Sequence, residues 1–142
     1  MKYFTWMVPF VMAITGTGSA SAAGAPVLYC EAPATADNAD VYRAACAEVA
    51  KEVRLDYPLL TVREGVAADK PVGNVIRLDI IKIDRHAITG RLAWSGRKAS
   101  AGGYVLGPVI TTTISDAALN ERLLREFARG LVMTSKIQFP KS

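Results

Sequence analysis

Residues 75–94 read VIRLDIIKIDRHAITGRLAW and carry the clearest periodic pattern of the chain. Apolar and charged side chains alternate over residues 76–80, which is typical of a strand with one buried face. The pattern predicts a strand over 75–83, and two isoleucines out of phase near its end favour a bulge or burial on both faces there. Residues 84–86 are expected to form a tight turn, and the alternation resumes over 88–94. The whole stretch is therefore predicted to be an antiparallel hairpin.

Two further strands are predicted on either side of this hairpin. Leu59–Glu64 reads as a short strand, and Tyr104–Ile114 as a strand that is interrupted at Gly107 and Pro108. Because proline has no N–H group for the sheet ladder, we expect the interruption at a sheet edge or a bulge. An exposed edge of this kind could support a homodimer.

Helical spacing of apolar residues occurs in two segments. The first covers residues 37–56, where Asp37 or Asn38 can cap the start and Pro58 prevents continuation. Its apolar stripe consists of Tyr42, Cys46, Val49 and Val53. The second helix is predicted to follow a cap at Ser115–Asp116. Its apolar face consists of Leu119 or Leu123, Phe127 and Leu131, with Leu124 and Ala128 in support.

The predicted element order is α-β-β-β-β-α. Each helix has one apolar stripe to bury, so both helices are expected on one face of the sheet. The predicted fold class is therefore α+β, a two-layer sandwich of two helices on a four-stranded, mainly antiparallel sheet. The 142 residues, 51% hydrophobic and 21% charged, fit one globular domain, predicted over residues 23–142. Residues 23–34 are rich in alanine and proline and are expected to be a short lead.

Residues 1–22 have the features of a secretory signal peptide. Lys2 is followed by a mostly apolar run over residues 3–14 and by an Ala20-Ser21-Ala22 cleavage site. The apolar run is shorter than the roughly 20 residues of a membrane span, so no transmembrane anchor is expected after cleavage. The sequence predicts cleavage near Ala22 and a location in the periplasm of a Gram-negative bacterium or outside the cell.

Cys30 and Cys46 are the two cysteines of the chain. An even pair in an exported protein is expected to form a structural disulfide, since catalytic dithiols usually have the closer C-x-x-C spacing. Closing a loop of this length stabilises the fold by roughly 3 kcal/mol in the chain-entropy model.

Sets of catalytic residues are sparse in this sequence. His86 is the single histidine and falls in the predicted turn, without a G-x-S-x-G motif elsewhere to supply a nucleophile. No metal-binding motif is present, so no metal and no cofactor are predicted. Asp79 and Asp84 are the remaining candidates, as a pair of carboxylates for acid–base catalysis.

Ser95–Gly103 reads SGRKASAGG and is predicted to be a flexible loop. It lacks the order of a phosphate-binding loop and leads into a strand rather than a helix. It remains a candidate for contact with a partner.

Charge is distributed unevenly along the expected mature chain. Residues 23–84 hold 7 lysines and arginines against 10 acidic residues, and residues 85–142 hold 9 against 3. We expect a basic patch for binding that consists of Arg97, Lys98, Arg122, Arg125 and Arg129. The three arginines of the second helix are spaced to form one stripe, which is either a solvated face balanced by neighbouring glutamates or a surface for an anionic partner. Nucleic acid is not expected as a partner, because the domain is exported and lacks interleaved aromatic and basic residues.

Together these features predict an exported, non-enzymatic binding or envelope-assembly accessory module. Its expected partner is an envelope protein or an anionic envelope component. One alternative is a secreted inhibitor of a hydrolase that acts through the Ser95–Gly103 loop, and another is a small enzyme that uses the carboxylate pair. The predicted layout is similar, in topology only, to small bacterial envelope accessory domains such as the lipopolysaccharide-assembly lipoprotein and the N-terminal domain of the Tol-Pal β-propeller protein. This likeness transfers no residue.

Overall fold

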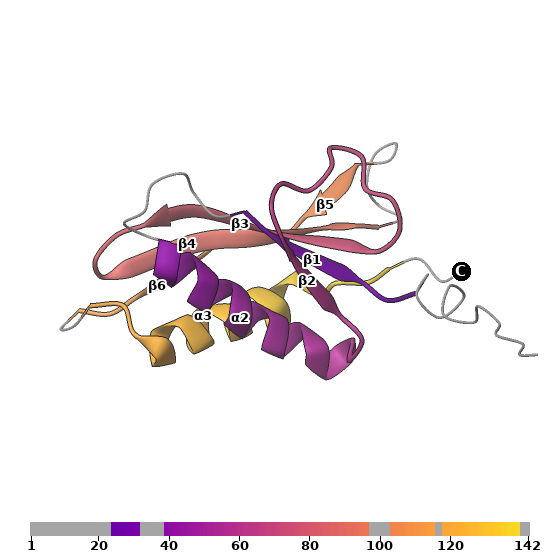
Figure 1. Ribbon diagram of the computed structural model, residues 1–142. Helices are drawn as coiled ribbons and strands as arrows, with labels where there is room; N and C mark the ends of the chain where they lie inside the picture. The colour runs from indigo at the N-terminus through magenta and orange to yellow at the C-terminus, as the bar shows by residue number, and fades with distance from the viewer. Residues whose placement is uncertain (1–23, 32–38, 97–102, 116–117, 140–142) are drawn as a thin grey trace, which may run out of the picture.

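The computed structural model describes residues 24–31, 39–96, 103–115 and 118–139 (Figure 1). In chain order the elements are β1 (Val27–Cys30), α2 (Ala39–Asp56), β2 (Thr61–Glu64), β3 (Val75–Ile83), β4 (Ala87–Ser95), β5 (Tyr104–Leu106), β6 (Ile110–Thr113) and α3 (Glu121–Ser135). The expected signal peptide lies outside the described residues.

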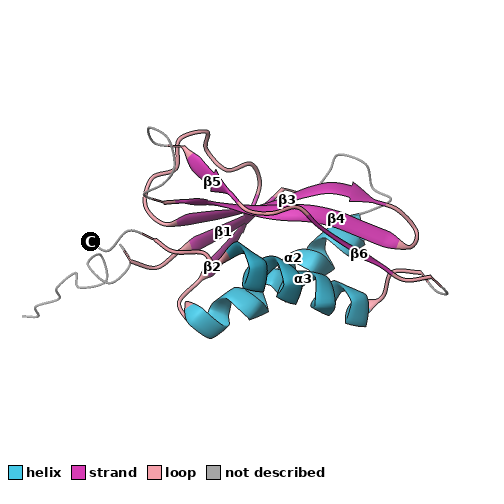
Figure 2. Cartoon of the chain, turned by 180° about the vertical axis from the view of Figure 1, so that it is seen from behind, coloured by secondary structure: helices cyan, strands magenta, loops and turns pink. Residues whose placement is uncertain are grey.

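The strands form one mixed sheet in the order β2-β1-β3-β4-β5, with β6 also paired to β4. β1 is parallel to both β2 and β3, whereas β4 is antiparallel to β3, β5 and β6. Figures 1 and 2 show both helices on the same face of this sheet. The predicted α+β class is thus confirmed, but the prediction of a four-stranded, mainly antiparallel sheet is wrong in strand number and in the direction of two pairings.

The unpredicted strand β1 occupies the alanine- and proline-rich lead. It is only four residues long, and its burial alternates, with Leu28 and Cys30 inside. Four residues provide too little periodicity to identify a strand from the sequence. Its place between β2 and β3 depends on pairing with residues more than thirty positions away, such as Val27 with Thr61.

The predicted hairpin is confirmed as β3 and β4. The register shifts between Ile80 and Lys82, so the bulge expected from the out-of-phase isoleucines is present. The next predicted strand is split into β5 and β6 at Gly107 and Pro108, on the edge of the sheet. The Gly107 N–H still donates to the Leu92 carbonyl oxygen at 2.8 Å, so the chain stays attached to β4 through the interruption.

Helix α2 ends at Asp56, two residues before Pro58, as predicted. Its expected caps, Asp37 and Asn38, lie outside the described residues. The stripe packs inward, with Cys46, Val49 and Val53 buried. Cys46 forms a disulfide with Cys30 of β1, with a Cα–Cα distance of 6.1 Å, which confirms the predicted pair.

Helix α3 begins later than the predicted cap at Ser115–Asp116. Its N-cap is Asn120, whose side chain accepts a hydrogen bond from the Leu123 N–H at 3.0 Å. The segment before Asn120 packs against the hairpin turn and does not join the helix, because the Leu119 N–H donates to the Arg85 carbonyl oxygen there. Asp116 lies outside the described residues. The predicted apolar face is buried from Leu123 to Leu131.

The core lies between the sheet and the two helices. Its largest fully buried side chains include Phe127 and Leu131 from α3, Val49 and Val53 from α2, and Leu28, Ile76, Ile88 and Leu92 from the sheet.

Within the described part of the chain, neither helix has the length and apolarity that a membrane span requires.

Candidate functional site

Neither helix covers the other face of the sheet (Figure 2). The strands carry a group of ion-paired side chains that includes Arg77, Asp79 and Arg91. Because successive side chains of a strand point to opposite faces, the buried Ile76 and Leu78 of β3 place Arg77 and Asp79 on this helix-free face. Asp79 is directly opposite Arg91 in the β3–β4 register.

Asp79 binds arginines on both sides. Arg77 donates two hydrogen bonds, from Nε to Oδ1 at 2.6 Å and from Nη2 to Oδ2 at 2.8 Å. Arg91 Nε approaches Oδ2 at 3.4 Å from the neighbouring strand. All three side chains are about one-quarter to one-third exposed, with relative areas of 29%, 24% and 32% for Arg77, Asp79 and Arg91. Partial burial and a bidentate contact hold this group in one geometry.

An aromatic ring supports Arg77 from β5. The Arg77 Cζ atom lies 4.5 Å from the centroid of the Tyr104 ring, which is a cation–π distance. The hydrogen bond from Arg77 to Asp79 raises the pKa of Arg77, and burial raises the pKa of Tyr104. The Tyr104 hydroxyl donates to the Ala68 carbonyl oxygen at 2.7 Å, which ties the loop between β2 and β3 to the same face.

The bulge adds a further cation to this face. After the register shift, Lys82 is opposite Thr89, whose hydroxyl lies 2.9 Å from that of Thr111. Ile83 and Ile88, the next pair, face the core side, so Lys82 is on the helix-free face and is exposed. We call Arg77, Asp79, Lys82 and Arg91 the sheet-face cluster. It holds three cations and one carboxylate.

The predicted arginine stripe on α3 differs from the sheet-face cluster because each of its cations has its own carboxylate partner. Each arginine has a carboxylate within 4 Å: Arg122 is 3.3 Å from Glu126, Arg125 is 3.5 Å from Glu121, and Arg129 is 3.8 Å from Glu52 of α2. The structure therefore brings three positive and three negative charges together along this surface. Arg97 and Lys98, the other members of the predicted patch, lie outside the described residues, as does most of the Ser95–Gly103 loop.

The structure separates the two candidate carboxylates. Asp79 lies within β3, whereas Asp84 is in the turn, where its Oδ1 accepts a hydrogen bond from the His86 N–H at 3.0 Å. Five residues of nearly extended chain separate their Cα atoms by roughly 15 Å. Paired glycosidase carboxylates are about 5 to 10 Å apart, which is closer than this pair.

Among the described residues, no group of three or more histidine, cysteine or acidic side chains could hold a metal ion.

The sequence pointed to part of the sheet-face cluster. Alternation in β3 and β4 predicts that Arg77, Asp79 and Arg91 face outward, but the same pattern is found on any solvated strand. The bulge that adds Lys82 was expected, whereas the contact with Tyr104 depends on the pairing of β5 with β4, which local spacing does not specify. No sequence signal marks the cluster as a unit.

No protein-family model matches the chain, and no curated protein matches it. The fold is similar to a chain of the PelC dodecamer from Paraburkholderia phytofirmans, at 11% sequence identity and a TM-score of 0.49, over 77% of this chain and 83% of that chain. At this score the similarity carries no conclusion about function.

Proposed function

We propose that this chain is an exported, non-enzymatic binding or envelope-assembly module that captures an anionic envelope component on its helix-free sheet face. The observation that carries the proposal is the sheet-face cluster, in which Arg77 and Arg91 both contact Asp79 and Lys82 lies on the same face beyond the bulge. The disulfide between Cys30 and Cys46 supports export, because such bonds persist in oxidising compartments.

The cluster favours binding of an anion over acid–base catalysis. Asp79 lies between two guanidinium groups, whose hydrogen bonds occupy both of its carboxylate oxygens. Arg77 is held by Asp79 and Tyr104 and serves to position its neighbours. Arg91 and Lys82 are the cations that would contact the ligand, with the hydroxyl groups of Thr89 and Thr111 beside them.

The first test compares two surfaces with the same change in charge. One variant carries Lys82→Glu and Arg91→Gln on the sheet face, and the other carries Arg122→Glu and Arg125→Gln on α3. Binding is measured to vesicles rich in phosphatidylglycerol and to neutral phosphatidylcholine vesicles. Each cation near an anionic surface contributes about 1 kcal/mol, so we expect the sheet-face variant to bind anionic vesicles at least about tenfold more weakly.

We expect the α3 variant to bind within about threefold of the wild type, because its arginines are already balanced by carboxylates. Loss of vesicle binding in the α3 variant alone would indicate that the binding site is on α3. Equal losses in both variants would indicate non-specific attraction. If the wild-type chain prefers neither vesicle, and crosslinking in cells captures no acidic partner, the proposal is wrong.

A further inference from the structure

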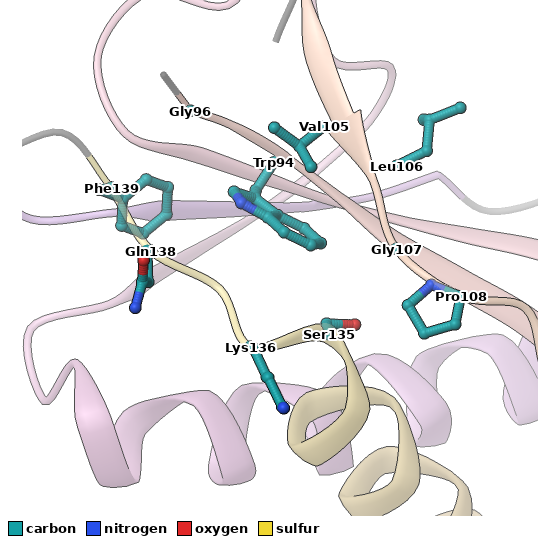
Figure 3. A pocket seen from close by; sticks show the side chains of 10 residues that line it. All are labelled: Trp94, Gly96, Val105, Leu106, Gly107, Pro108, Ser135, Lys136, Gln138 and Phe139. Atoms are coloured by element: carbon teal, nitrogen blue, oxygen red, sulfur yellow. The ribbon is translucent and has the colours of Figure 1, made fainter. Parts of the chain in front are cut away.

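A cleft of about 550 Å³ lies between the edge of the sheet and the segment that follows α3 (Figure 3). Helix α3 ends at Ser135, and residues 136–139 continue from it along one side of the cleft (Figure 3). The cleft is lined by Trp94, Gly96, Val105, Leu106, Gly107, Pro108, Ser135, Lys136, Gln138 and Phe139. A volume of this size is typical of sites for small ligands.

Both walls of the cleft are held in place. The Tyr57 hydroxyl donates to the Ile137 carbonyl oxygen at 3.4 Å, and the rings of Tyr57 and Phe139 meet edge to face at 5.3 Å. On the other side, the Gly107 N–H is bonded to Leu92 of β4. The contacts of the fold therefore fix the position of both walls of the cleft.

The lining is apolar along most of its length. In Figure 3 the indole of Trp94 and the ring of Phe139 face the space, together with Val105 and Pro108. A peptide in such a cleft would leave its backbone N–H and C=O groups without partners. An unbranched hydrocarbon chain has no such groups.

Polar groups gather at the end of the cleft nearest α3. The Ser135 hydroxyl is buried and has no hydrogen-bond partner among the described residues. Lys136 has a left-handed backbone, with φ of 53°, and no described carboxylate lies within 4 Å of its exposed ammonium. Unpaired and strained residues of this kind cluster at ligand sites.

We propose that the cleft binds one acyl chain of an amphiphile, with the hydrocarbon against Trp94 and an anionic carboxylate or phosphate group beside Lys136. The full positive charge of Lys136 exceeds the partial negative charge of the α3 C-terminus, about half an elementary charge. Glu52 and Asp56 line a neighbouring cavity with Lys136, but neither carboxylate forms an ion pair with its ammonium. The site is separate from the sheet-face cluster and does not depend on the function proposed for it.

The test uses Trp94 as the reporter. The chain has two tryptophans, Trp6 and Trp94, and only Trp94 remains after the expected cleavage near Ala22. Laurate, 1-dodecanol and acetate are titrated into the mature protein, with laurate below its micellar concentration and dodecanol below its solubility limit. We expect laurate to change the Trp94 emission saturably, dodecanol to bind about two- to fivefold more weakly because it lacks the charge, and acetate to have no effect.

Matched variants locate the binding. Val105→Phe fills the cleft and should weaken laurate binding at least about tenfold, whereas Val62→Phe makes the same change at a separate cavity beside the disulfide and should leave it unchanged. Lys136→Asn keeps a residue that tolerates the left-handed backbone but removes the charge, so it should lower the affinity for laurate to that for dodecanol.

Three results would overturn the proposal: no saturable response of the wild type to laurate, equal loss in Val105→Phe and Val62→Phe, or unchanged laurate binding in Val105→Phe. If Val105→Phe does not fold, the comparison of laurate with dodecanol in Lys136→Asn decides. Equal affinity of the two amphiphiles for the wild type would remove the anionic group from the proposal. If laurate binds more tightly than dodecanol, a comparison of laurate with dodecyl phosphate, which has a chain of the same length, distinguishes a carboxylate from a phosphate head group.

Discussion

Single residues determine how closely β5 can approach the rest of the fold. A Cβ atom on Gly107 would lie 2.8 Å from the Leu92 carbonyl oxygen and 2.9 Å from Ser135 Oγ, distances that require the backbone to move. In contrast, a Cβ atom on Gly130 of α3 would meet only Ile110, at an ordinary contact distance of 3.7 Å.

The same substitution is therefore expected to have opposite effects at these two glycines. Gly107→Ala should lower the free energy of unfolding by about 2 kcal/mol, because it overpacks the sheet edge. Gly130→Ala should raise it by about 0.5 to 1 kcal/mol, since alanine loses less backbone entropy within a helix. Urea unfolding of both variants measures the difference. A stable Gly107→Ala variant would mean that β5 moves freely away from β4.

The raised pKa of Tyr104 predicts that the fold loses stability at alkaline pH. Its protonated hydroxyl donates to Ala68, and burial raises its pKa above the ordinary value of about 10. Since the folded-state pKa is the higher one, the contribution of Tyr104 is complete below about pH 10 and is lost as the pH rises through the folded-state pKa.

The readout is the difference in thermal stability between the wild type and Tyr104→Phe. We expect the wild type to be more stable near neutral pH and the difference to shrink above about pH 10. The other tyrosines titrate in both proteins and cancel in the comparison. A difference that is constant with pH would show that the hydroxyl is not held by Ala68 in solution.

Among the elements, β1 is the one whose position depends most on a covalent bond. It is a four-residue strand between β2 and β3, and Cys30 links it to Cys46 of α2. The 16-residue separation makes the disulfide worth roughly 3 kcal/mol. A strand this short between two parallel partners needs such support, because parallel pairing brings no local turn to hold it.

Reduction of the disulfide is expected to lower the melting temperature by more than about 10 °C. The double variant Cys30→Ala, Cys46→Ala should melt at the lower temperature whether or not reductant is present. Calorimetry with and without reductant measures both. A wild type unaffected by complete reduction would indicate that β1 is held by its pairing and by burial of Leu28 alone.

The molecule as a whole has two sides that correspond to the two halves of its sequence. Residues 23–84 supply β1, β2, β3 and α2, and residues 85–142 supply β4, β5, β6 and α3. Since β3 and β4 meet in the middle of the sheet order, the acidic half of the sequence lies on one side and the basic half on the other. Such a separation of charge orients a protein at an anionic surface.

The predicted export of the chain can be tested directly. When the full-length chain is expressed in a Gram-negative host, we expect periplasmic protein that starts at Ala23 or Gly24 and has the mass of the oxidised form. Intact mass spectrometry before and after reduction measures both features. Retention of residues 1–22 on a membrane fraction would contradict the expected cleavage.

Local patterns in the sequence predicted the hairpin, its bulge, the apolar faces of both helices, the end of α2 and the partner of each cysteine. These features depend on spacing between near neighbours or, for the cysteines, on there being only two. The tertiary structure decided the rest: the insertion of β1 between two parallel strands, the late start of α3 at Asn120, the carboxylates beside the α3 arginines and the cleft at Trp94. Each of these arises from contact between residues distant in the chain, such as Arg129 with Glu52, and periodicity within one segment does not specify which distant segment will pack against it.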